Sequence, residues 1–140
     1  MLQEMSHIGI VVHDLDKAVA LWTDVFGYRE VERQHVELEG VRNAFVSPGP
    51  PRGEAVVIEL MEPLDKDDMS SAIARRLAEV GEGIFHVAMF ADDPEAASTR
   101  FKEAGLTVID RPAVWEGEQP RAIVHPRSAN GVLLEVCARP

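Results

Sequence analysis

The stretch His7-Ile-Gly-Ile-Val-Val12 decides the fold, because it returns later in the chain as His86-Val-Ala-Met-Phe-Ala91. Each of these strand-like runs is followed by an acidic turn, Asp14-Leu-Asp16 after the first and Asp92-Asp-Pro94 after the second. Internal self-similarity of this kind indicates that one structural unit is used twice. We therefore read the chain as two related halves.

The later parts of the halves match in the same order. In each half a helical stretch stops at a glycine, a strand begins with arginine, and another strand carries a central glutamate. These pairs are Gly27 and Gly105, Arg42–Pro48 and Arg121–Pro126, and Val57–Met61 and Leu133–Cys137. The first histidine and the glutamate are 52 positions apart in one half (59 − 7) and 49 in the other (135 − 86). Four coincidences in one order indicate a true repeat.

Each half is predicted to contain a strand, a helix and then three strands. The first helix is expected to follow a cap at Asp14 or Asp16, and the second a cap at Asp92 or Asp93 with Pro94 in its first turn. Their apolar stripes are Ala18, Val19, Trp22, Val25 and Phe26, and Ala97, Phe101 and Ala104. Met69, Ile73, Leu77 and Val80 predict a linking helix that ends at Gly81, and loops are expected over 48–53 and 115–120.

We expect one domain over 1–140, with a first module over 1–65, the linking helix within 66–82 and a second module over 83–140. A chain of 140 residues with 46% hydrophobic and 27% charged residues is typical of one packed domain. The apolar run at 8–12 is too short to span a bilayer and no signal peptide opens the chain, so a cytoplasmic protein with no membrane partner is expected. The net charge of −10 disfavours nucleic acid as a partner. Cys137 is the only cysteine, which excludes a disulfide framework.

Histidine side chains begin both repeated strands. Because side chains alternate along a strand, His7 shares a face with Gly9, and His86 with Ala88. These small neighbours leave open space beside each imidazole, which suits the lining of a site. His13, His35 and His125 have no such setting and are expected to be ordinary residues.

Glu59 and Glu135 are the sharper signal, because each stands inside an apolar strand. A buried carboxylate without a partner is very costly, so two of them at equivalent points of a repeat indicate a shared cation. Two neutral imidazoles and two carboxylates balance the charge of one divalent metal. His7, Glu59, His86 and Glu135 are therefore the candidate metal ligands. This donor set suits cobalt, nickel, zinc or manganese.

With these residues the sequence resembles the vicinal-oxygen-chelate superfamily, which includes glyoxalase I, fosfomycin-resistance proteins and extradiol dioxygenases, and within it the methylmalonyl-CoA epimerases. The resemblance covers almost the whole chain. The stretches that carry it are His7–Val11 with Asp14–Asp16, Ile58–Leu64, Gly81–His86 and His125–Glu135. The first is common to the superfamily, and the others are closer to the epimerases.

The resemblance implies an α+β fold of two paired βαβββ modules, with a cup-shaped mixed sheet around the metal, and a homodimer. It also implies metal binding by the same four residues. In that chemistry one divalent metal per chain holds the oxygens of a malonyl-type acyl-CoA and stabilises the enolate formed when the α-proton leaves. Glu135, as a ligand that can loosen from the metal, is the first candidate for the base.

One position departs from the epimerase pattern. Some epimerases have a glutamate, proposed as the other base, three residues after the glycine of a Gly-Val motif; Gly40-Val-Arg-Asn43 has Asn43 there. An amide cannot act as a general base at neutral pH. Either another group serves, with Glu37 and Glu39 nearby in sequence, or the substrate differs.

Other readings within the superfamily therefore stay open. They are glyoxalase-type isomerisation of a thiol adduct, thiol transfer to an epoxide antibiotic, and a metal-free bleomycin-binding module. The binder is disfavoured because it has no need of four ligands. Extradiol dioxygenases generally have longer chains.

Overall fold

The computed structural model describes residues 1–49 and 55–140. Its strands are β1 (Leu2–Val11), β2 (Arg29–Val36), β3 (Val41–Ser47), β4 (Val57–Pro63), β5 (Gly83–Ala91), β6 (Val108–Arg111), β7 (Arg121–Val124) and β8 (Leu134–Cys137). Its α-helices are α1 (Leu15–Ala20), α2 (Ala72–Glu79) and α3 (Pro94–Glu103). The predicted order of strand, helix and three strands therefore occurs twice. The expectation of an α+β fold with a mixed sheet is confirmed.

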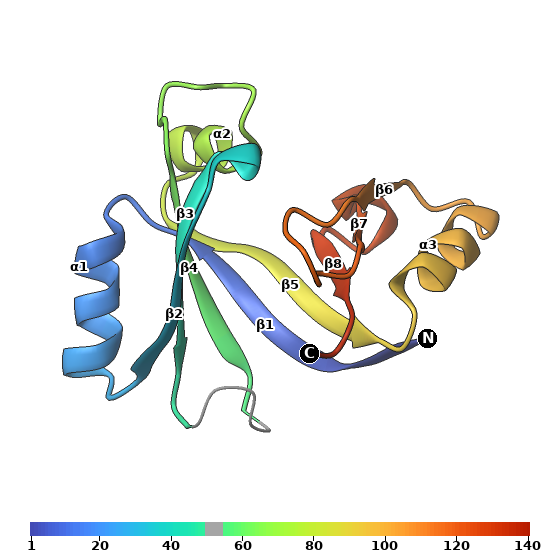
Figure 1. Cartoon of the computed structure of the whole chain (residues 1–140). Coiled ribbons are helices and arrows are strands. Elements are labelled where there is room, and N and C mark those ends of the chain that lie inside the picture. Colours follow the sequence, from blue (N-terminus) through green and yellow to red (C-terminus); the bar gives the residue numbers. More distant parts are fainter. Residues whose placement is uncertain (50–54) are drawn as a thin grey trace. The chain divides into compact units, whose positions relative to one another are not determined.

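The described strands follow the order β2-β3-β4-β1-β5-β8-β7-β6 in the sheet (Figure 1). The chain divides into two compact units: one holds 8–85, and the other holds 1–7 together with 86–140. β1 and β5 run from one unit into the other, so His7 and His86 both belong to the second of these units.

In the unit of residues 8–85, α1 packs on β3 and β4. One apolar cluster in the core of this unit comprises Val12, Leu15, Val19, Ala44, Val46, Ile58 and Leu60. The Asp14 carboxylate accepts a hydrogen bond from the backbone N–H of Lys17 and so caps α1. After Ala20 the helix continues as a π-helical turn (Leu21–Val25), and Gly27 ends it with a φ of 81°, a conformation that favours glycine. This turn leaves Val25 and Phe26 exposed although they fit the helical stripe.

In the other unit, α3 packs on β6, β7 and β8 around Ala91, Ala97, Ala122 and Val136. Asp93 caps α3 by accepting from the backbone N–H of Ala96, and Pro94 opens its first turn. β8 is parallel to β5, with Ala88 opposite Glu135, and antiparallel to β7, with Ile123 opposite Glu135. This register puts the central strand β8 between the strand of His86 and the strand that begins at Arg121.

The linking helix forms, but it is shorter than the sequence suggested. α2 begins after the cap Ser71 and ends before Val80, with Ile73, Ala74 and Leu77 buried. Met69 and Val80 were expected in its apolar stripe and are instead exposed, because both lie outside the helical residues. Of the loop expected over 48–53, residues 50–53 lie outside the described residues.

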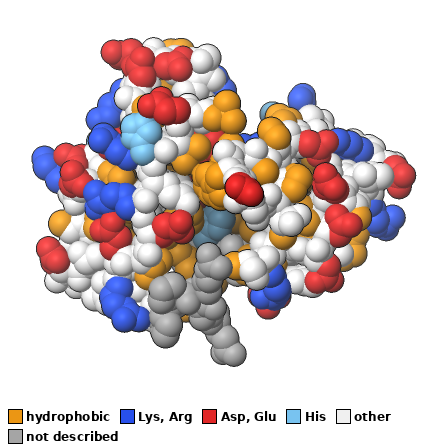
Figure 2. Space-filling model, in the orientation of Figure 1, with side chains coloured by type: hydrophobic (Ala, Val, Ile, Leu, Met, Phe, Trp, Pro, Cys, Tyr) orange, Lys and Arg blue, Asp and Glu red, His pale blue; other side chains and the backbone are white. Residues whose placement is uncertain are grey.

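Acidic and basic side chains are interspersed over the face of the molecule seen in Figure 2.

Within residues 1–49 and 55–140, no helix combines the length and apolarity needed to cross a bilayer.

Candidate metal centre

Three of the four predicted ligands lie together in one unit. His7 from β1, His86 from β5 and Glu135 from β8 are all buried, and their ligand atoms lie within 4.8 Å of one another. The two Nε2 atoms are 3.0 Å apart. The Glu135 carboxylate places Oε1 4.0 Å from Nε2 of His7 and Oε2 3.7 Å from Nε2 of His86.

These separations fit one divalent ion. A zinc-type ion binds imidazole nitrogen at about 2.1 Å, so two nitrogens bound at a right angle lie roughly 3.0 Å apart. The distance between two donor atoms on the same ion cannot exceed about 4.2 Å, which is twice the bond length. The observed 3.0, 3.7 and 4.0 Å all satisfy that limit when each imidazole is paired with the Glu135 oxygen that faces it, Oε1 for His7 and Oε2 for His86. Two neutral imidazoles and one carboxylate form a common donor set for such an ion. His7, His86 and Glu135 can therefore hold one metal ion together.

The orientation of His7 is fixed by a neighbour on its own strand. The Ser6 hydroxyl lies 3.1 Å from Nδ1 of His7. When Nδ1–H donates to this hydroxyl, Nε2 keeps the lone pair that a metal needs, as in other histidine ligands. Gly9 and Ala88, the small residues that follow the two histidines by two positions on their strands, are both buried.

Glu135 has a further partner that the sequence did not reveal. Nη1 of Arg121 donates to Oε1 of Glu135 at 3.1 Å, and Nη2 lies 3.2 Å from Oε1 of Glu118. Oε2 of Glu118 in turn accepts from the backbone N–H of Val114 at 2.7 Å. Strand parity was the available signal, because Arg121 precedes Ile123 by two residues and Ile123 lies opposite Glu135.

Glu59, the fourth predicted ligand, belongs to the unit of residues 8–85. It is 7% exposed on β4, and its Oε2 accepts a hydrogen bond of 2.6 Å from Nδ2 of Asn43 on β3. Asn43 is also buried, and its Oδ1 has no hydrogen-bond partner among residues 1–49 and 55–140. The pair shows how a carboxylate is kept inside an apolar strand. Its role as a metal ligand stays a prediction.

The remaining histidines have ordinary settings. His35 is exposed and pairs with Glu37, and Nδ1 of His125 accepts from the backbone N–H of Arg127 at the start of a 3₁₀ turn. His13 is exposed, and its backbone N–H donates to Glu82.

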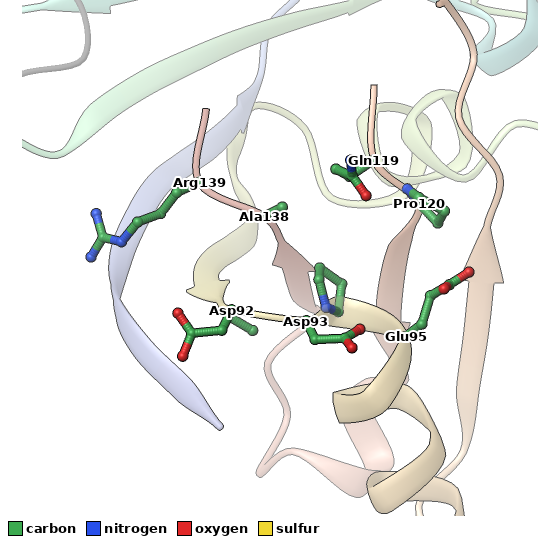
Figure 3. A pocket seen from close by; sticks show the side chains of 9 residues that line it. Asp92, Asp93, Glu95, Gln119, Pro120, Ala138 and Arg139 are labelled. Carbon is green, nitrogen blue, oxygen red and sulfur yellow. The ribbon is translucent and has the colours of Figure 1, made fainter. Parts of the chain in front are cut away.

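A polar hollow lies in the same unit as His7, His86 and Glu135. It has a volume of about 500 Å³ at the start of α3, and its lining includes Asp92, Asp93, Glu95, Gln119 and Arg139 (Figure 3). Its lining includes none of His7, His86 and Glu135. Arg139 is already engaged by Glu4, Gln3 and the ring of Phe90. The hollow is therefore separate from the candidate metal centre.

The family model of the glyoxalase/bleomycin resistance protein/dioxygenase superfamily matches residues 6–123. The chain belongs to this superfamily. The match begins one residue before His7 and includes His86, so both histidines of the centre lie inside the family domain. The resemblance seen in the sequence is thereby confirmed.

Curated relatives point to a narrower group. The chain is 30% identical to the ethylmalonyl-CoA/methylmalonyl-CoA epimerase of Cereibacter sphaeroides, over 97% of this chain and 98% of the relative. It is 29% identical to the uncharacterized protein YqjC of Bacillus subtilis, over 97% and 92% of the two chains.

A solved structure agrees with this grouping. A variant of Streptomyces coelicolor methylmalonyl-CoA epimerase in complex with 2-nitronate-propionyl-CoA has a TM-score of 0.82 and 28% identity, over 99% of this chain and 98% of that one. This chain is thus similar to methylmalonyl-CoA epimerases in sequence and in fold.

Proposed function

We propose that this protein is a metal-dependent isomerase that epimerises a malonyl-type acyl-CoA. The observation that carries the proposal is the buried cluster of His7, His86 and Glu135, with donor separations that suit one divalent ion. The similarity to methylmalonyl-CoA epimerases supports the substrate class, because one of these is in complex with an acyl-CoA analogue. Cobalt, nickel, zinc and manganese all suit the donor set.

The reaction requires removal of a proton from the carbon between a thioester and a carboxylate, and its return on the other face. A bound divalent ion supplies Lewis-acid stabilisation of the negative charge that develops on the substrate oxygens. The imidazoles of His7 and His86 must be neutral to hold the ion, because a metal binds the lone pair of an unprotonated nitrogen. Burial of the cluster excludes water, which strengthens every electrostatic interaction there.

Glu135 is proposed as the general base. Its carboxylate is the only acidic group among the three clustered ligands, and each of its oxygens faces a different imidazole. A ligand that loosens from the ion can take the α-proton and return it. We propose Glu59 as the fourth ligand, because it is buried and equivalent to Glu135 in the repeat.

The second acid/base group is not Asn43, because an amide accepts no proton at working pH. Glu37 is an unfavourable replacement: its side chain is 83% exposed and pairs with His35. Asn43 stands where some epimerases have a glutamate base, and this departure favours a second candidate with a different substrate. That candidate is glyoxalase-type isomerisation of a thiol adduct. That reaction uses the same ligands but a different substrate.

Proton exchange in heavy water tests the proposal directly. With methylmalonyl-CoA as substrate, the metal-loaded protein is expected to replace the α-proton by deuterium, as measured by mass spectrometry. A chelator-treated sample serves as the control and should lose the exchange. No exchange above the enzyme-free rate with any malonyl-type thioester would reject epimerisation, and turnover of a hemithioacetal instead would support the second candidate.

We further propose that the protein is a homodimer. β2 and β6 end the described sheet, and an open strand edge invites pairing with another chain. Light scattering after gel filtration is expected to give about twice the chain mass of 15.4 kDa at micromolar concentration. A mass equal to one chain would contradict this proposal.

A further inference from the structure

Arg121 occupies an unusual place beside the candidate metal centre. Its guanidinium divides its donors between two carboxylates: Nη1 contacts Glu135 at 3.1 Å, and Nη2 contacts Glu118 at 3.2 Å. All three side chains are largely buried, with 18%, 8% and 13% exposure for Arg121, Glu135 and Glu118. Charges in such surroundings act on one another more strongly than on an exposed surface.

The oxygen that Arg121 holds is one that faces the cluster. Oε1 of Glu135 lies 4.0 Å from Nε2 of His7 and accepts the guanidinium hydrogen bond as well. A guanidinium keeps its positive charge at every working pH. It therefore both repels a metal cation and occupies part of the carboxylate that would bind it.

Glu118 opposes this effect from the other side. Its Oε1 shares the guanidinium, and its Oε2 is anchored by the backbone N–H of Val114 at 2.7 Å. The negative charge of Glu118 offsets much of the charge of Arg121. More of the negative charge of Glu135 then remains available to a cation.

We infer that Arg121 is a positioning residue that competes with the metal ion for Glu135, and that Glu118 limits this competition. The inference rests on the proposed metal dependence. The inference goes beyond metal dependence, because it assigns control of the metal affinity to the segment from Val114 to Arg121. If Arg121 merely held Glu135 in place, removing Arg121 would weaken metal binding instead of strengthening it.

Titration of metal-free protein with Co²⁺ separates these alternatives. Arg121→Met is expected to lower the Kd for Co²⁺ about tenfold, and Glu118→Gln is expected to raise it about tenfold. Substitution of a residue that hydrogen-bonds to a metal ligand typically changes metal affinity by about 10- to 100-fold, and we expect the lower end of that range. Arg121→Lys retains the charge and should stay within about threefold of the parent. Arg100→Met, an exposed arginine on α3, is the matched control and should leave the Kd unchanged.

A second variant protects the test against misfolding, because Arg121→Met leaves two buried carboxylates without their cation. The double variant Glu118→Gln/Arg121→Met removes one charge of each sign, and its Kd should lie about tenfold or more below that of Glu118→Gln. Thermal unfolding establishes that each variant is folded.

The outcomes are distinct. If the parent binds Co²⁺ and the removal of Arg121 weakens binding or leaves it within twofold, in the single and in the double variant, the competition is overturned while the metal centre stands. If the parent binds no Co²⁺, the proposed metal dependence fails and this inference fails with it.

Discussion

Replacing both His7 and His86 by alanine is expected to abolish stoichiometric binding of a divalent ion. The double variant removes both nitrogen donors of the cluster and leaves only carboxylates, Glu135 and the proposed fourth ligand Glu59. Two carboxylates, one of them beside an arginine, hold such an ion far more weakly than a donor set that includes both imidazoles. Metal analysis of the purified protein should fall from about one ion per chain to a small fraction of that value, and each single variant should lose at least about tenfold in affinity.

The matched control uses histidines outside the cluster. A His13→Ala/His35→Ala variant removes the same side chains from exposed positions and should keep the parental metal content. Thermal unfolding without metal separates lost ligands from lost structure, because the exposed variant should unfold close to the parent. Stoichiometric metal in the His7→Ala/His86→Ala variant would rule out the proposed centre.

The fold could be predicted well because two periodic signals agreed. The repeat fixed the order of elements, and alternation along the strands identified the faces of His7 and His86. Local chemistry placed the helix caps, since Asp14 and Asp93 accept the hydrogen bonds expected of them. Helix ends were less predictable: apolar spacing alone extended the linking helix to Met69 and Val80, and it gave no sign of the π-helical turn after Ala20.

The sequence singled out the three residues that the structure brings together, His7, His86 and Glu135, but not the residues that surround them. Apolar strand neighbours drew attention to Glu135, but its contact with Arg121 depends on the register between β7 and β8. The role of Glu118 was still harder to predict from the sequence, because Glu118 lies in a segment without regular secondary structure. Partners of this kind follow from tertiary pairing, which no local pattern encodes.

The two halves of the repeat treat their equivalent residues differently. Glu59 is held by the neutral amide of Asn43, whereas Glu135 is held by the cation Arg121. Arg42 corresponds to Arg121 in the repeat, yet it pairs with Glu62 instead of the repeated glutamate. Divergence of the halves has therefore given the two carboxylates different electrostatic settings, and only Glu135 lies in the described cluster.

Glu135→Gln is expected to keep the fold and most of the metal but to lose proton abstraction. Glutamine still offers a carbonyl oxygen to the ion and a hydrogen-bond acceptor to Arg121, yet it cannot accept a proton at working pH. Loss of a general base typically costs about 10² to 10⁴ in rate. The measurement is the rate of deuterium entry into methylmalonyl-CoA in heavy water, with the metal content determined on the same sample.

Three companion variants make this result specific. Glu103→Gln makes the same substitution at an exposed position on α3 and should exchange at the parental rate. Glu59→Gln tests the next candidate for the base, and its exchange should exceed that of Glu135→Gln. Asn43→Glu restores the acid/base group of the epimerase motif and should raise the rate if a second base is what the protein lacks. Exchange by a metal-loaded Glu135→Gln protein at the parental rate would move the base to Glu59, because proton transfer would then proceed without the carboxylate of Glu135.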